Sequence, residues 1–205
     1  DTVYQLLSPA LSLSFSLTAA GYQTAISKYV AADSAKRPSG NLKPLLAGIS
    51  ITLPLSLVTN AILFFSADPI GIFLLKDHRT VPMLRILSFS VPFAALHACI
   101  NGYFYGKKKA SVPALTQLLE QLARVSCVFL VTGADLAEGR TPSINAAVLG
   151  LTVGEIFSML IALVCLYIHL YPDSSILSLQ NICPSVPVYR DLLGMALPLT
   201  ANRIV

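Results

Sequence analysis

The stretch PLLAGISITLPLSLVTNAILFFSA, residues 44–67, contains no Asp, Glu, Lys or Arg. Residues 2–27 and 86–106 form two further charge-free stretches. A helix needs about 20 mostly apolar residues to cross a bilayer core of about 30 Å. Each of the three stretches is therefore long enough to span a membrane.

The composition of the whole chain points the same way. Of its 205 residues, 55% are hydrophobic and 12% are charged, whereas roughly 25% are charged in an ordinary soluble domain. Mean hydropathy is +0.71. The sequence thus excludes a typical water-soluble globule and predicts an all-α integral membrane protein.

Turn-forming residues divide the chain into five whole spans and a sixth that is cut short. The expected helices cover about residues 3–31, 44–66, 81–105, 111–133 and 141–171, and the last begins at residue 190. The polar stretch 32–41 should break the first helix, and Ser111 is the expected N-cap of the fourth. Residues 67–80 hold an apolar patch too short to span, which we expect at the interface. Residues 172–189 are predicted to form a linker between the parts 1–171 and 190–205.

Both ends of the chain predict a fragment, because Asp1 follows no initiator Met and Arg203-Ile204-Val205 stops inside an apolar run.

Basic residues set the expected orientation. One side carries Lys28, Lys36, Arg37, Lys43, Lys107, Lys108, Lys109 and Arg190, and the other carries Lys76, Arg79, Arg85 and Arg140. The positive-inside rule makes the first side, including the linker 172–189, cytoplasmic.

One face of the expected helix 111–133 is polar at mid-membrane. Gln117, Glu120, Gln121 and Arg124 follow at i, i+3, i+4 and i+7. Unpaired charges at that depth cost several kcal/mol, so the face should look into protein or water. Two interpretations stay open: a structural Glu120–Arg124 ion pair, or a hydrophilic cavity for a polar or anionic substrate.

Other intramembrane polar residues also leave alternatives. Glu155 could be protonated, hydrogen-bonded or involved in ion coupling. Lys28 could reach the headgroups or bind a phosphate, and His97 is expected to be a hydrogen-bonded interior residue. Arg85, near the outer end of its span, suits a headgroup contact.

Catalytic and metal chemistry find little support in the sequence. It contains no G-x-S-x-G, H-E-x-x-H or G-x-x-x-x-G-K-[ST], and its four cysteines have no C-x-x-C spacing. We therefore expect a protein that is not an enzyme and that has no cofactor and no metal site.

Several segments resemble a known transporter family. They are Tyr4–Pro9, Leu17–Lys28, Val91–Phe93, Gly102–Gly106, Gln117–Arg124 and Leu192–Thr200. Together they are similar to the polysaccharide biosynthesis flippases typified by stage V sporulation protein B. That group belongs to the multidrug/oligosaccharidyl-lipid/polysaccharide exporter superfamily, whose members have two six-helix lobes and work by alternating access.

The resemblance implies helices two to six of the N-lobe, lacking the first helix, followed by the start of the seventh helix. It also implies a bacterial plasma-membrane protein that flips undecaprenyl-pyrophosphate-linked oligosaccharide or peptidoglycan precursor to the outer leaflet, for cell wall, spore cortex or surface polysaccharide. Its partners would be this substrate, membrane lipid and cell-wall synthesis proteins, with no nucleic acid.

A pyrophosphate headgroup needs cations, and sugar hydroxyls need hydrogen-bonding partners. The candidate substrate-binding residues are Lys28, Gln117, Glu120, Gln121, Arg124, Asn202 and Arg203, and Glu155 is the candidate for ion coupling. Two alternative functions remain, a cation-coupled multidrug antiporter of the same fold and a non-transporting membrane scaffold.

Overall fold

A computed structural model of the chain describes residues 21–36, 42–74, 78, 80–139, 145–171, 184 and 186–204. Its elements are α2 (Gly21–Lys36), α3 (Lys43–Phe65), α4 (Ala67–Pro69), the π-helical turn η2 (Ile70–Leu74), α5 (Thr80–Gly106), α6 (Ser111–Ala137), α7 (Asn145–Leu170) and α9 (Val186–Ile204). Four of these helices, α3, α5, α6 and α7, are long and apolar enough to cross a membrane. The described part of the chain contains no strand, so the prediction of an all-α membrane protein is confirmed.

The helix bounds differ from expectation at several ends. α2 continues to Lys36, because the first residue that opposes a helix is Pro38, which disfavours helical geometry at the residue before it. α6 runs past Gly133 to Ala137 and stops where Gly139 takes a positive φ of 70°, the usual backbone geometry after a helix end. Its N-cap is Ala110 and not Ser111, which is the first helical residue.

The two ends of the chain differ from the expected helices in other ways. α9 begins at Val186, four residues earlier than expected, since Pro187 is compatible with a first helical turn. Residues 1–20, which hold most of the first expected span, lie outside the described residues.

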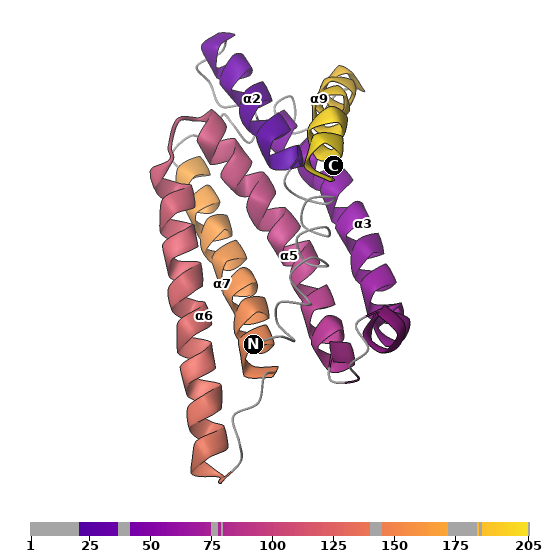
Figure 1. The fold of residues 1–205 in the computed structure, drawn as a ribbon. Helices are drawn as coiled ribbons and strands as arrows, with labels where there is room; N and C mark the ends of the chain where they lie inside the picture. The colour runs from indigo at the N-terminus through magenta and orange to yellow at the C-terminus, as the bar shows by residue number, and fades with distance from the viewer. Residues whose placement is uncertain are drawn as a thin grey trace.

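α5 is the central helix of the described part (Figure 1). It packs against α2, α3 and α7, while α9 lies against α2 and α3. α6 packs mainly against α7 and scarcely touches α5. As a result, 67% of the apolar window of α5 is buried but only 11% of that of α6. The exposed side of α6 carries Leu118, Leu122, Phe129 and Leu136, an apolar surface suited to lipid.

Two pairs of glycines let helices approach backbone to backbone. At Gly102 a Cβ atom would lie 2.6 Å from the carbonyl oxygen of Gln23, and at Gly106 it would lie 2.8 Å from that of Ser27. On α7, Gly150 and Gly154 meet the α6 backbone in the same way, at Arg124 and Glu120. Glycines four residues apart commonly allow such close packing between membrane helices. These contacts fix α2 to α5 and α6 to α7.

Candidate functional site

A polar cavity of about 360 Å³ lies between α5 and α6, two helices that touch each other little. It is lined by Gln23 of α2, by Ala94, His97, Ala98, Asn101 and Tyr105 of α5, by Pro113, Gln117 and Glu120 of α6, and by Glu155 of α7. His97, Asn101 and Tyr105 follow at intervals of four residues and so share one face of α5. The cavity therefore places amide, phenol, imidazole and carboxylate groups inside a protein whose other surfaces are largely apolar.

His97 is the centre of a buried hydrogen-bond network within this cavity. Its Nε2 atom lies 2.7 Å from the side-chain nitrogen of Asn101, and its Nδ1 atom lies 2.8 Å from the hydroxyl of Ser158. Thr116 extends the network, with its hydroxyl 3.3 Å from Nε2. The whole His97 residue is only 8% exposed. The structure thus agrees with the expectation that His97 is a hydrogen-bonded interior residue.

Two carboxylates approach His97 from different helices. Glu155 Oε2 on α7 lies 3.8 Å from Nδ1. Glu120 on α6 is buried, and its Oε1 accepts a hydrogen bond of 2.7 Å from the Arg124 guanidinium. One ligand atom from each of His97, Glu120 and Glu155 lies within 4.8 Å of the other two, so the three residues are close enough to share a cation.

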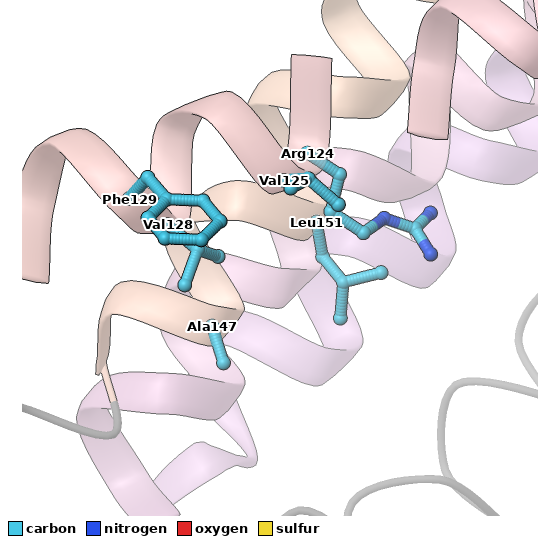
Figure 2. Close-up of a pocket in the computed structure, with 6 residues that line it drawn as sticks. All are labelled: Arg124, Val125, Val128, Phe129, Ala147 and Leu151. Carbon is cyan, nitrogen blue, oxygen red and sulfur yellow. The ribbon is translucent and has the colours of Figure 1, made fainter. Parts of the chain in front are cut away.

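Arg124 pairs with Glu120 but is not itself among the residues that line the polar cavity. Arg124 lines a second hollow of about 230 Å³ together with Val125, Val128, Phe129, Ala147 and Leu151 (Figure 2). Its guanidinium points away from Phe129 and Ala147, which lie at the other end of this hollow (Figure 2). The polar face of α6 thus carries the Glu120–Arg124 ion pair and also lines a polar cavity, so it contains features of both interpretations.

The remaining residues predicted for the site are dispersed. Gln117 and Glu155 line the polar cavity, whereas Gln121 and Lys28 are exposed and are not among its lining residues. The backbones of Asn202 and Arg203 belong to α9, but their side chains lie outside the described residues. Arg85 pairs with Asp68 at 2.7 Å and lies over the ring of Phe64.

Sequence reasoning did not assign Gln23, His97, Asn101 or Tyr105 to the site. The spacing of the last three on one helix face was the available signal. It is weak on its own, because polar residues in a membrane helix also serve packing. Among the described lining residues two are acidic, Glu120 and Glu155, and none is a Lys or Arg. The Arg124 guanidinium reaches the cavity only through its pair with Glu120.

Three of the four cysteines lie in the described residues, and all three are free. Cys99 is buried, where its sulfur lies 3.2 Å from the Thr52 hydroxyl, and Cys127 and Cys165 are partly buried. Cys183 lies outside the described residues.

Comparison with known proteins gives a consistent assignment. A model of the polysaccharide biosynthesis protein family matches residues 3–205. The chain is 31% identical over 204 residues to stage V sporulation protein B of Bacillus subtilis (strain 168), an alignment that covers 99% of this chain and 39% of that protein. The chain thus spans about two fifths of the length of this relative. No solved structure matches the chain. Since the family model covers nearly every residue, this multi-pass membrane protein belongs to the polysaccharide biosynthesis protein family.

Proposed function

We propose that this chain is part of a transporter that flips a lipid-linked saccharide across the bacterial plasma membrane by alternating access. The cargo is an oligosaccharide or peptidoglycan precursor on undecaprenyl pyrophosphate, moved from the inner to the outer leaflet for wall, cortex or surface polysaccharide synthesis. The family membership and the similarity to a sporulation protein support this assignment.

The observation that carries the proposal is the polar cavity between α5 and α6. Several membrane-spanning helices contribute to it, and its lining includes Gln23, Asn101, Tyr105 and Gln117. Amide and phenol groups both donate and accept hydrogen bonds, so they can replace the water around sugar hydroxyls. A headgroup that lost this water without replacement would face a prohibitive cost in crossing hydrocarbon.

The pyrophosphate requires a different part of the protein, since the described cavity wall is acidic. We assign it to the cations Lys28, Arg124 and Arg203, with Asn202 beside the last and Gln121 one turn from Gln117. Guanidinium groups bind phosphate oxygens with strong, paired hydrogen bonds. The sugar would then occupy the cavity while the pyrophosphate stays at its edge.

A second candidate function is supported by the same acidic wall. In a cation-coupled multidrug antiporter of this fold, carboxylates such as Glu120 and Glu155 would bind the coupling ion and the cationic drug. A membrane scaffold, by contrast, would have no use for a polar cavity and would tolerate neutral residues at Arg124 and Lys28 together.

Leaflet exchange in sealed proteoliposomes distinguishes these functions. The natural full-length protein is reconstituted, and exchange of a fluorescent undecaprenyl-pyrophosphate oligosaccharide is followed beside uptake of a cationic dye. Gln117→Leu removes one cavity hydrogen-bonding group, worth about 0.5–1.5 kcal/mol, so exchange should fall about two- to tenfold. Asn60→Leu is the matched control, because this amide lies on α3 outside the cavity and its oxygen has no hydrogen-bond partner among the described residues.

Each outcome assigns a function. Exchange that is reduced by Gln117→Leu and unchanged by Asn60→Leu supports the flippase. Dye uptake without lipid exchange assigns the protein to the antiporter class. Absence of both activities supports the scaffold function. Exchange that is equally fast with Gln117→Leu removes the cavity from the transport path.

A further inference from the structure

We propose that His97, Glu120 and Glu155 form a proton-binding site in which the imidazole of His97 holds one proton between two carboxylates. We further infer that this proton drives transport, and this second step rests on the function proposed above. The site joins α5, α6 and α7, three of the four described helices that can span the membrane.

The partners of both His97 ring nitrogens allow the imidazole to bind a proton. Nδ1 of His97 faces the Ser158 hydroxyl at 2.8 Å and the Glu155 carboxylate at 3.8 Å. Nε2 faces the Asn101 amide at 2.7 Å. Reversal of that amide exchanges its donor for its acceptor, so Asn101 can satisfy both the neutral and the charged imidazole.

The charges around His97 leave a place for one positive charge. With both carboxylates ionised and Arg124 paired with Glu120, the group carries a net charge of −1 while His97 is neutral. The other helices that line the cavity add no charge, since α5 contributes the phenol of Tyr105 and α2 contributes the amide of Gln23. A net charge inside a membrane is costly. Protonation of His97 brings the total to zero.

A proton fits this site better than a metal ion. A divalent cation would leave the site with a net positive charge, and it would have to displace Ser158 or Asn101 from the imidazole, because both ring nitrogens already have partners. Hard cations such as Ca²⁺ and Mg²⁺ prefer a shell of oxygen ligands, whereas here an imidazole stands at the centre. A proton needs no coordination shell.

The site also borders a space large enough to hold water. His97, Glu120 and Glu155 all line the cavity of about 360 Å³, which has room for several water molecules. A proton can therefore reach the imidazole through the same polar space that receives the cargo. The proton and the cargo thus bind in the same cavity, as coupling of their transport requires.

The direct test is the charge state of His97, which needs no transported substrate. The natural full-length protein is labelled with ¹⁵N-histidine, and the His97 signal is assigned by its loss in His97→Asn. At pH 7 the wild type should show both ring nitrogens protonated. Glu155→Gln and, independently, Glu120→Gln each remove one negative charge, so both should show a neutral imidazole.

Control variants separate charge from structural damage. Glu155→Asp retains the carboxylate and should keep His97 charged. Asp68→Asn removes an exposed carboxylate near the other end of α5, beside Arg85. Arg85 is twelve residues from His97, about 18 Å along the helix, so this variant should also keep His97 charged.

The proposal is overturned if His97 is neutral in the wild type at pH 7, or if it stays charged in both Gln variants. Stoichiometric binding of added Zn²⁺ that moves the His97 signal in wild type but not in Glu155→Gln would also overturn it, in favour of a metal site.

The coupling step is tested in the proteoliposomes. A gradient of one pH unit should accelerate lipid exchange up to tenfold in wild type and leave Glu155→Gln unaffected. Lack of exchange in any condition would refute the flippase function alone, because the NMR result stands without it. Exchange that ignores the gradient in wild type would refute proton coupling.

Discussion

Replacement of Gly102 by Ala should destabilise the protein, because the packing cost at the α2–α5 contact exceeds the gain in helix preference of α5. The added Cβ would lie 2.6 Å from the carbonyl oxygen of Gln23 and 3.2 Å from its Cα atom. Ordinary contact begins at 3.4 Å, so α2 and α5 must separate by 3.4 minus 2.6, or 0.8 Å. Both neighbours are backbone atoms, and no side-chain rotation can relieve the contact. Overpacking of this kind costs about 1–3 kcal/mol.

The matched control is Gly133→Ala on α6, where an added Cβ meets nothing within 4 Å. Both substitutions replace a glycine within a membrane helix, and each gains about 0.5–1 kcal/mol of helix preference. This gain cancels when the two variants are compared. The difference in their free energies of unfolding is therefore the packing cost alone, about 1–3 kcal/mol.

Reversible unfolding of the natural full-length protein in mixed micelles of rising SDS fraction measures this difference. Gly102→Ala should unfold at a lower SDS fraction than wild type, and Gly133→Ala at an equal or higher one. Equal shifts in the two variants would refute the close α2–α5 contact. Lipid exchange should fall in Gly102→Ala as well, because the backbone that moves belongs to Gln23, which lines the cavity.

Two further predictions concern ion pairs. Arg124→Gln deprives the buried Glu120 of its guanidinium partner, a change that costs about 3–5 kcal/mol in buried pairs, whereas Glu120→Gln/Arg124→Gln should regain most of that stability in the same unfolding assay. If Arg124 also binds pyrophosphate, the double variant will fold and still fail to exchange lipid; restored exchange would make the pair purely structural. The exposed Asp68–Arg85 pair, with side chains about half exposed, should contribute only about 0.2–1 kcal/mol in a double-mutant cycle, and a coupling energy that survives 1 M salt would contradict this assignment.

The membrane class and most of the helices could be predicted because hydrophobic length is a local property. The spans expected at 44–66 and 81–105 coincide with α3 and α5 to within one residue at each end. Helix ends were less predictable, since they depend on single backbone positions. The end of α6 follows from a positive φ at Gly139, and the preceding Gly133 is tolerated in open space.

The site was only partly predictable because it depends on how helices face one another. The i, i+4 spacing of Glu120 and Arg124 already implied their ion pair, which the structure contains. No local pattern indicates that Glu155 lies 3.8 Å from His97, since the two residues are far apart in the chain and belong to different helices. Gly102–Gly106 and Gly150–Gly154 bring α2 against α5 and α6 against α7. Their role is visible only when the opposing backbone is known.

Under the proposed transport function, the glycine contacts also determine where the protein can change its cargo. The α5 wall of the cavity is held against α2 at Gly102, immediately beside Asn101, so a larger side chain there displaces a whole helix. The α6 wall is different, because Gln117 is exposed and α6 scarcely touches α5. Evolution and protein engineering should therefore find new specificities at Gln117, while the α5 side stays constant among related transporters.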